Sequence, residues 1–496
     1  MWYHKFITWP LWVILLITSL SPFSASAAPV NVHRVAMIPT AQRDLDQLGD
    51  LPRYWIEMTI DLEARVRPNF TGRERILFTN HEKLSLKDLY LRLYPNGGAG
   101  YGNGRLTVTE IRLDGQPVRF QLEIDGTAVR VPLPEPLAPG EELMLEAVFT
   151  GRVANALRGE GIGYGVYSQL NGLLTLANGY PILAVLDDDG WNLDPVGGPG
   201  DAVYSDVGLY EVSITVPETA QVAASGIEME ASQNGNGTVT HRYVSGPMRD
   251  FFIAVGDRLS VLSEQVGDTV VNAYFLPEDA SGGSRVLEIG VAALELFNRR
   301  FGLYPYKELD IVELPVRRSL GVEYPGIVLI AKPLYQNPDN FTLQMFVSHE
   351  VAHQWWYGVL GNDVIEEPWL DEALATYTSV VYLEEVFGAR AAQDTFRFFS
   401  QRYQDIRARG IQEPITAPAP EFARGGYTPV VYYGGALFYR AIREQIGDAA
   451  FDEGLRTYYQ QFKYRIATST DLLKIFEQIS GQELDPLYEQ WLFSSE

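Results

Sequence analysis

Two histidines stand four residues apart at His349 and His353, and Glu350 directly follows the first of them. On an α-helix, positions i and i+4 lie on one face, so both imidazoles can reach a single metal ion. Glu350 lies about 100° round the helix, beside the metal rather than on it. That is the position of a general base for a metal-activated water. The motif predicts one zinc ion per chain; the alternative is a pair of core or surface histidines beside an exposed glutamate.

A zinc hydrolase needs a third protein ligand and leaves the fourth position to water. The chain has no cysteine, so this ligand must be a histidine or a carboxylate. We predict Glu372, because the residues between it and His353 leave room for one loop and the start of a second helix. Asp371 points about 100° away and is expected to support a ligand or to be exposed. The alternative for Glu372 is a solvated helix charge.

The helix that carries the histidines is expected to begin after Asn340, an N-cap residue, and to end near Gly358. Apolar residues around the motif would hold this helix in a core. Buried histidines need polar partners there, and a metal ion supplies one. The acidic stretch Glu366-Glu367-Pro368 is expected to lead into the second helix, because acidic groups are favourable at its positive end.

The chain is long enough for two or three domains. Residues 29–50 are expected to be an unstructured leader or linker. Residues 51–258 alternate apolar and polar positions, as in the stretch 56–63, which predicts an N-terminal β-rich, sandwich-like domain. Residues 259–496 contain a helical stretch at 284–301, two apolar strands at 309–314 and 327–330, and then mostly helices. The predicted fold is multidomain, with a β-rich domain followed by an α+β domain.

Residues 1–28 resemble an export signal. An apolar run at 11–17 is followed by small residues and by Ala25-Ser26-Ala27, a cleavage-site pattern. The chain is therefore expected to be exported, to the periplasm, the cell surface or the medium. An uncleaved membrane anchor is the alternative, and no later segment is apolar enough to span a bilayer. The net charge of −24 argues against a nucleic-acid partner.

The zinc motif and Glu372, which lies within Trp369-Leu370-Asp371-Glu372-Ala373, together resemble the gluzincin metallopeptidases, specifically the aminopeptidase N family. The resemblance covers nearly the whole chain after the signal. It implies a saddle-like β domain followed by a thermolysin-like zinc peptidase domain at 259–496. The long C-terminal helical domain of many members is missing, so the chain resembles a compact bacterial-type form.

A second family motif is an exopeptidase loop, usually Gly-Ala/Gly-Met-Glu-Asn. Here Leu320-Gly321-Val322-Glu323-Tyr324-Pro325-Gly326 occupies its place. The loop keeps the glutamate but departs at Leu320, Val322 and Tyr324. The resemblance implies that Gly321 and Glu323 bind substrate, with Glu323 holding a free α-amine. The alternative is a loop carboxylate with a local structural role.

A third motif is a catalytic tyrosine before a helix. Tyr432-Tyr433-Gly434-Gly435 resembles it, and the resemblance implies that Tyr432 stabilises the oxyanion of the tetrahedral intermediate. Tyr427 matches a second active-site tyrosine of some members and is predicted to bind substrate. The chain holds 28 tyrosines, so a structural role is the alternative for Tyr432.

These observations predict a zinc metalloaminopeptidase that acts on peptides with a free N-terminus. In this mechanism Glu350 takes a proton from the attacking water and later gives one to the leaving amine. Two alternatives use the same residues: an endopeptidase or non-peptide hydrolase with the same zinc site, and a catalytically silent peptide-binding protein. The preferred N-terminal residue and the oligomeric state are left open.

Overall fold

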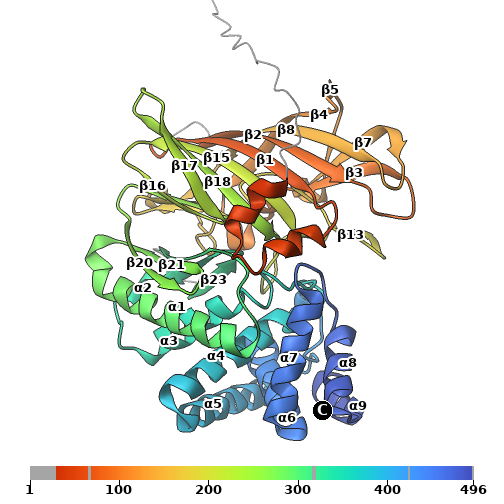
Figure 1. Ribbon diagram of the computed structural model, residues 1–496, viewed down its shortest axis with the longest axis vertical. Coiled ribbons are helices and arrows are strands. Elements are labelled where there is room, and N and C mark those ends of the chain that lie inside the picture. The colour runs from red at the N-terminus through yellow and green to blue at the C-terminus, as the bar shows by residue number, and fades with distance from the viewer. Residues whose placement is uncertain (1–29, 65–68, 315–319, 423–424, 494–496) are drawn as a thin grey trace, which may run out of the picture.

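The computed structural model describes residues 30–64, 69–314, 320–422 and 425–493. The predicted export signal at 1–28 lies outside these residues. Figure 1 shows a β-rich part stacked on a helical part, with a small sheet between them. Among the helices of the described ranges, none has the length and apolar character needed to cross a bilayer.

The largest sheet of the β-rich part has eight strands in the order β17-β18-β15-β1-β2-β8-β4-β5. Strand β1 alternates buried and more exposed residues, as its apolar-polar sequence predicts. It pairs parallel with β15 and antiparallel with β2. The strands are β1 (Arg53–Ile60), β2 (Phe70–Thr79), β4 (Arg105–Leu113), β5 (Gln116–Pro117), β8 (Glu142–Arg152), β15 (Gly208–Pro217), β17 (Ile227–Gln233) and β18 (Thr238–Met248).

Three smaller sheets complete this part, in the orders β16-β19-β11-β10-β9, β12-β3-β7-β6 and β13-β14. Their strands are β3 (Leu86–Arg92), β6 (Gln121–Glu123), β7 (Ala128–Leu137), β9 (Ala154–Asn155), β10 (Ser168–Leu170), β11 (Leu173–Leu176), β12 (Ile182–Leu183), β13 (Leu186–Asp187), β14 (Gly190–Trp191), β16 (Gln221–Ala224) and β19 (Ile253–Gly256). Buried side chains from the larger sheets share one apolar core.

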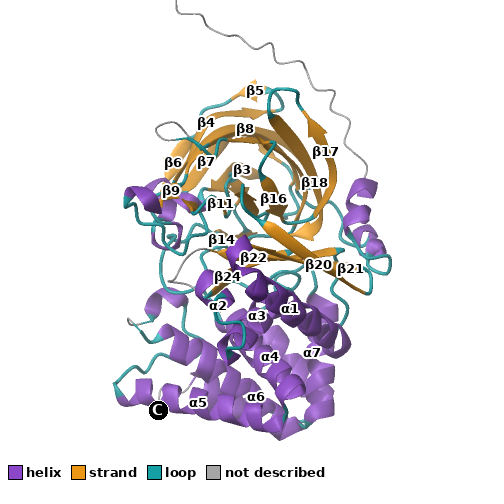
Figure 2. Cartoon of the chain, turned by 90° about the vertical axis from the view of Figure 1, so that its left-hand side faces the viewer, coloured by secondary structure: helices purple, strands orange, loops and turns teal. Residues whose placement is uncertain are grey.

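A mixed sheet, β20-β21-β22-β24-β23, begins directly after the β-rich part and lies between it and the helices (Figure 2). Strand β22 pairs in parallel with both of its neighbours, β21 and β24. Strands β22 and β24 are almost entirely buried, as their continuous apolar runs predict. The strands are β20 (Ser260–Val266), β21 (Thr269–Phe275), β22 (Glu308–Leu314), β23 (Gly321–Tyr324) and β24 (Ile327–Ala331).

Helices make up most of the remaining chain. The expected helix at 284–301 is α1, which packs against β20, β21 and β22. The helices are α1 (Ala280–Arg300), α2 (Lys332–Tyr335), α3 (Phe341–Ala352), α4 (Trp369–Phe387), α5 (Ala389–Ala408), α6 (Gly435–Ile446), α7 (Asp448–Phe462), α8 (Ser469–Ser480) and α9 (Asp485–Tyr488). The expected sequence of a β-rich domain followed by an α/β-containing one is confirmed.

Arg249, directly after β18, joins the two parts. Its buried guanidinium donates hydrogen bonds to three carbonyl oxygens, those of Ser205 at 3.0 Å, Tyr357 at 2.8 Å and Arg465 at 2.6 Å. Ser205 belongs to the β-rich part, whereas Tyr357 and Arg465 belong to the helical part. One side chain therefore fixes the first part against two segments of the second.

Two local expectations are wrong. The leader expected at 29–50 is ordered where it is described: short helical turns at Val30–Ala36 and Gln42–Asp46 bury Met37, Ile38 and Leu45. The zinc-motif helix α3 ends at Ala352 rather than near Gly358. Tyr357 has a φ of 110°, and the amide of Gly358 donates to the carbonyl of His353, so the chain turns back instead of continuing the helix.

Candidate active site

His349 and His353 lie at the end of α3. The side chain of Asn340 accepts a hydrogen bond from the amide of Thr342, which makes it the N-cap that the sequence predicts. Both imidazoles are buried, and their Nε2 atoms lie 3.2 Å apart. The Nδ1 atom of His353 lies 3.1 Å from the carbonyl oxygen of Trp356, and this contact fixes the ring so that Nε2 faces its partner.

Glu372 comes from the first turn of α4, which packs against α3. Its Oε2 atom lies 3.4 Å from Nε2 of His349 and 3.4 Å from Nε2 of His353. The amide of Glu372 donates to Oδ1 of Asp371 at 2.6 Å. Asp371 is itself buried, so of its two expected places the exposed one is wrong. It supports the backbone at the residue that carries the third ligand atom.

The spacing of these three atoms fits a zinc ion. Zinc bonds to histidine nitrogen and carboxylate oxygen are about 2.0–2.2 Å, so tetrahedral geometry separates ligand atoms by about 3.3–3.6 Å. The observed separations are 3.2 to 3.4 Å. His349, His353 and Glu372 are all buried and form a group that could hold a metal ion. Two facing ring nitrogens beside a buried carboxylate are the donor set of a His₂Glu zinc site.

Burial and the neighbouring groups shift the pKa values of Glu372 and His353 in opposite directions. Burial alone would raise the pKa of Glu372, but the two imidazoles hold it at about 2. Burial alone would lower the pKa of His353, but hydrogen bonding to Glu372 and the nearby carboxylates raise it to about 9. Burial lowers the pKa of His349. A carboxylate between two imidazoles is a site that a divalent cation can occupy, because binding to such ligands releases any protons that they hold.

Glu350 is buried beside the metal ligands and faces β23. Its pKa is raised to about 8, chiefly by burial and also by Glu372 and Asp201. A Cβ at Gly321 would lie 2.1 Å from Oε1 of Glu350, so any larger residue there would require this carboxyl group to shift. Gly321 therefore shapes the position of Glu350, and it also lines the cleft.

Glu323 extends from β23 toward the same cluster. One oxygen of its carboxylate, one carboxylate oxygen of Glu350 and one ring nitrogen of His353 all lie within 4.8 Å of one another. Burial, Asp201 and Glu350 raise the pKa of Glu323 well above its usual range. Gln354 fixes the strand end that follows: its Nε2 donates to the carbonyl of Tyr324 at 2.9 Å, and its Oε1 accepts from the amide of Gly326 at 2.8 Å.

Tyr432 and Tyr427 line the same cleft as the cluster. Tyr432 lies on a π-helical turn, Thr428–Gly434, stacks on the ring of His349 and donates its hydroxyl to Oε1 of Glu372. Such π-turns are frequent at functional sites. Tyr427 packs against Tyr432 and is buried, and its hydroxyl fills the space that a Cβ at Gly200 would need.

The predicted site residues meet in one cleft of about 540 Å³. All of them except the fully buried His353 line this cleft directly. The lining includes Gly321, Glu323, His349, Glu350, Glu372, Tyr427 and Tyr432.

Residues 285–491 match the model of the peptidase family M1 domain. This part of the chain is an M1 peptidase domain. The resemblance to compact, aminopeptidase N-like gluzincins is thereby confirmed for family and fold. Glu323, Tyr432 and the three predicted zinc ligands lie within the matched region. Asp201 lies outside it.

Curated relatives that match this chain are named as aminopeptidases. It is 25% identical over 297 residues to Aminopeptidase M1 of Arabidopsis thaliana, covering 57% of this chain and 33% of that one. It is 21% identical over 370 residues to Aminopeptidase N of Haemonchus contortus, covering 69% and 36%. The chain thus spans about a third of the length of these relatives.

Solved structures share the fold over most of both chains. The M1 zinc metallopeptidase from Deinococcus radiodurans has a TM-score of 0.65 at 21% identity, covering 89% of this chain and 94% of that one. A variant of the same enzyme, bound to a Tyr-Ser-Ala substrate, has a TM-score of 0.64 at 21% identity with the same coverage.

Asp201 is a residue of the site that its sequence does not predict. It lies in the loop between β14 and β15 of the β-rich part, and it reaches the cleft of the M1 domain. Burial and the charge of Glu372 raise its pKa to about 6, and its carboxyl group is hydrogen-bonded to that of Glu323. The sequence around it, Pro195–Gly200, is typical of a loop and carries no motif. Only the packing of the two parts brings Asp201 to Glu323.

Proposed function

We propose that the chain is a zinc-dependent aminopeptidase that removes N-terminal residues from peptides. The observation that carries this proposal is the placement of three ligand atoms at zinc spacing in one cleft with Glu350 and Glu323. The M1 match and the names of the relatives support the same reaction class. Export remains a proposal that rests on the N-terminal sequence alone.

His349, His353 and Glu372 would hold the zinc ion. A zinc ion there supplies Lewis acidity toward the carbonyl oxygen and lowers the pKa of water. Glu350, buried beside the ligands, accepts the proton of the attacking water and delivers it to the leaving nitrogen.

Tyr432 is placed to assist the same step. Its hydroxyl donates to Glu372 in the structure, and its ring lies over His349. Rotated toward the reacting carbonyl, this hydroxyl would donate to the developing oxyanion. Tyr427 packs behind it and bounds the cleft.

Glu323 and Asp201 would hold the α-ammonium of the substrate. Their paired carboxyl groups are buried or partly buried and lie beside further acidic groups, so a cation is the group that this end of the cleft favours. Because Glu323 and Glu350 lie close together, only one residue fits between the ammonium and the scissile carbonyl. Cleavage would then fall after the first residue.

Zinc dependence tests this proposal. Protein stripped with a chelator should hydrolyse leucine para-nitroanilide only after zinc is added back, with one equivalent bound per chain. His353→Ala should lose both zinc binding and hydrolysis. Retained hydrolysis in stripped protein, or a chain that binds no zinc, would refute the proposal.

A further inference from the structure

The turn that follows the zinc-motif helix contains a strained residue. Tyr357 has a φ of 110°, a backbone conformation that a bulky residue rarely adopts. Such a conformation costs free energy and persists only where the surrounding contacts hold it. The turn supplies two of these contacts: the amide of Tyr357 donates to the carbonyl of Leu360 at 2.7 Å, and the next amide, that of Gly358, donates to the carbonyl of His353 at 2.8 Å. The others come from the β-rich part.

Two consecutive residues directly after β18 hold Tyr357 at its backbone and at its side chain. The guanidinium of Arg249 donates to the carbonyl oxygen of Tyr357 at 2.8 Å. The hydroxyl of Tyr357 donates to Oδ2 of Asp250 at 3.1 Å. All three residues are buried, and hydrogen bonds are stronger in such surroundings than in water. The β-rich part therefore fixes both ends of one residue of the M1 domain.

Asp250 is itself held in place by the β-rich part. The side-chain amide of Asn178 lies 3.5 Å from the same Oδ2, and the hydroxyl of Tyr101 donates to Oδ1 of Asn178 at 2.9 Å. The other oxygen of Asp250, Oδ1, is buried and has no hydrogen-bond partner among the described residues. Asp250 is thus a fixed acceptor for the hydroxyl of Tyr357.

The backbone next to Tyr357 carries the contact that orients a predicted zinc ligand. The carbonyl oxygen of Trp356 lies 3.1 Å from Nδ1 of His353. This carbonyl belongs to the peptide group that joins Trp356 to Tyr357, so its direction depends on the conformation of Tyr357. A histidine whose Nδ1 donates to a carbonyl presents its Nε2 lone pair to a metal. A different conformation of the turn would therefore turn the ring of His353 away from His349 and Glu372.

We propose that Asp250 is a positioning residue of the zinc site. By accepting the hydroxyl of Tyr357, it keeps the turn in the conformation in which the carbonyl of Trp356 orients His353. The inference rests on the zinc site of the proposed function, but not on which bond the protein hydrolyses. The affinity for zinc then depends on the docking of the β-rich part, although none of the three predicted ligands belongs to that part.

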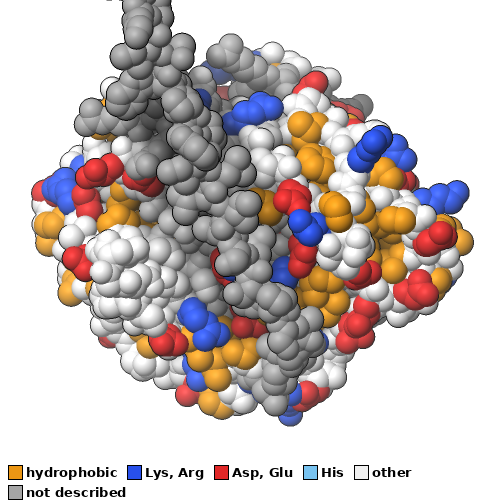
Figure 3. Space-filling model, turned by 90° about the horizontal axis from the view of Figure 1, so that it is seen from above, with side chains coloured by type: hydrophobic (Ala, Val, Ile, Leu, Met, Phe, Trp, Pro, Cys, Tyr) orange, Lys and Arg blue, Asp and Glu red, His pale blue; other side chains and the backbone are white. Residues whose placement is uncertain are grey.

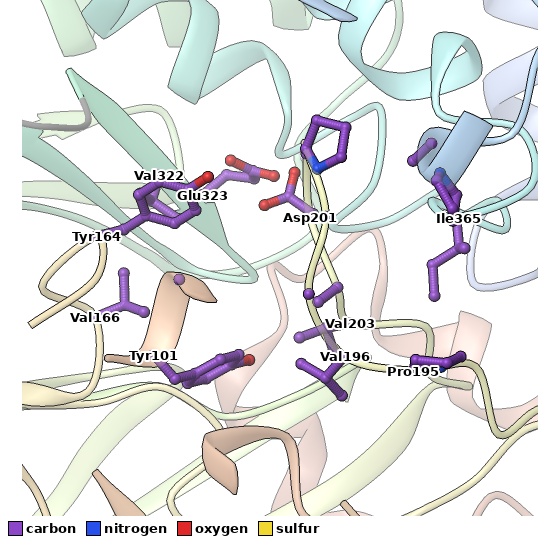
Figure 4. Close-up of a pocket in the computed structure, with 18 of the residues that line it drawn as sticks. Tyr101, Tyr164, Val166, Pro195, Val196, Asp201, Val203, Val322, Glu323 and Ile365 are labelled. Atoms are coloured by element: carbon purple, nitrogen blue, oxygen red, sulfur yellow. The ribbon is translucent and has the colours of Figure 1, made fainter. Parts of the chain in front are cut away.

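Turnover alone would not test this role. Figure 4 shows the carboxyl groups of Glu323 and Asp201 facing each other at one end of a cavity of about 60 Å³. Tyr357 also lines this cavity, so a change there can alter substrate binding directly. The first readout is therefore the zinc affinity without substrate, measured by competition with a chromophoric chelator. The second is the visible absorption of the cobalt(II)-loaded protein, which reports the geometry of the ligands.

Tyr357→Phe removes the hydroxyl and keeps the ring. Its zinc affinity should fall about tenfold, the lower end of the loss expected when an outer partner of a metal ligand is removed, and its cobalt spectrum should change. Tyr243→Phe is the matched control, because this buried hydroxyl donates to the carbonyl of Val222 within the β-rich part at 3.1 Å. The control should keep the wild-type affinity and spectrum. A fall of less than threefold in Tyr357→Phe, or an equal fall in the control, would overturn the proposal.

Variants of Asp250 show whether the two residues act together. Asp250→Asn keeps an oxygen acceptor and should hold the zinc affinity within about threefold of the wild type, whereas Asp250→Leu should lower it as Tyr357→Phe does. The double variant with Leu and Phe should bind zinc no more weakly than the weaker single variant, because both changes remove the same hydrogen bond. Additive losses would contradict the proposal. If Asp250→Leu does not fold, Asp250→Asn carries the test, and a loss equal to that of Tyr357→Phe would overturn it.

The outcomes separate this inference from the proposed function. A wild-type chain that binds no zinc would refute both. Zinc binding that Tyr357→Phe leaves unchanged would overturn only the role of Asp250. Weakened zinc binding in that variant, together with a zinc-loaded wild type that hydrolyses no free-amine anilide or peptide, would support the role of Asp250 and refute only the aminopeptidase.

Discussion

Two buried glutamates of the cleft, Glu372 and Glu350, differ in pKa. The imidazoles of His349 and His353 hold the pKa of Glu372 at about 2, whereas burial and acidic neighbours raise that of Glu350 to about 8. Environments that push two carboxyl pKa values apart assign different roles to them. Glu372 is suited to be a permanent ligand, and Glu350 is suited to exchange a proton.

Glu350→Gln tests this division of roles. The variant keeps the shape of the side chain but cannot accept a proton, so kcat should fall about 10²–10⁴-fold. Zinc stoichiometry should remain at one per chain, because the three ligands are unchanged. Metal analysis and steady-state kinetics on the same preparation check both. Activity within a few fold of the wild type would remove Glu350 from the proton transfer.

Gly321→Ala tests the fit between β23 and Glu350. The added methyl would lie 2.1 Å from Oε1 of Glu350, so the carboxyl group must move. Because a displacement of about 1 Å at a reacting group can cost about 10²-fold, kcat should fall by about ten- to a hundredfold while zinc binding stays intact. Gly161→Ala, where the added methyl meets only the end of the Asn103 side chain, is the control. Equal kinetics in both variants would contradict the steric role of Gly321.

The site residues that lie close together in the sequence could be predicted from their spacing. The two histidines, Glu350 and Glu372 lie within 24 residues, and helical spacing alone places them on adjoining helices. Asp201 lies more than 120 residues before Glu323, and no spacing rule relates them. Residues of one supersecondary unit are therefore predictable from sequence, and residues contributed by another part of the molecule are not.

Periodic patterns also predicted most elements that position the site. Apolar alternation predicted β1, and continuous apolar runs predicted β22 and β24. The end of α3 was missed because buried aromatic residues extend the apolar pattern past the helix. Trp355 and Trp356 are fully buried in a turn rather than in a helix. The structure of residues 30–50 was missed for a related reason. Their buried apolar residues follow no helical or strand period, so the sequence pattern did not indicate that they pack against the rest of the protein.

Gln354, in that turn, links the zinc-motif segment to the strand of Glu323. Gln354→Leu removes the hydrogen bonds of this side chain to the carbonyl of Tyr324 and the amide of Gly326, together with a longer one from the hydroxyl of Tyr304. The strand end should shift, so KM for free-amine substrates should rise about tenfold or more while zinc affinity holds. Gln354 is a positioning residue, and kcat should change less than KM.

The control for this variant is Gln344→Leu, the same substitution at a buried position on α3. The side-chain amide of Gln344 lies 3.0 Å from the hydroxyl of Tyr382, a residue of α4. Its KM should equal that of the wild type. A rise in KM in both variants would show that the effect comes from general loosening of the helix.

On the scale of the whole molecule, the cleft is complete only where the two parts meet. Asp201 comes from the β-rich part, Glu323 from the mixed sheet and Glu372 from the helices, and Arg249 joins these parts through three carbonyls. The face seen from above in Figure 3 carries acidic and basic side chains interspersed among apolar ones. The net charge of −24 is consistent there with solubility rather than with a nucleic-acid partner.

A buried acid in the large sheet predicts how stability depends on pH. Glu74 is 2% exposed, neither of its carboxyl oxygens has a hydrogen-bond partner among the described residues, and burial raises its pKa well above 4.5. Above pH 4.5 the unfolded chain releases this proton while the folded chain retains it. The folded state therefore loses about 1.4 kcal/mol per pH unit from this residue until its own pKa is reached.

Glu74→Gln should remove that loss. The difference in Tm between pH 5 and pH 8 should be smaller in the variant than in the wild type, and the variant should be the more stable one at pH 8. Glu142→Gln, at an exposed position of β8, should behave as the wild type. Thermal unfolding followed by circular dichroism checks this, and an identical pH dependence in all three proteins would contradict it.

The most direct test of the central claim is mass spectrometry of a peptide of about ten residues, with leucine first, incubated with the zinc-loaded chain. The peptide with a free N-terminus should lose single residues stepwise from that end, and its N-acetylated form should remain intact. Internal fragments, or equal cleavage of the acetylated peptide, would contradict an aminopeptidase whose substrate is anchored by its α-ammonium at Glu323 and Asp201.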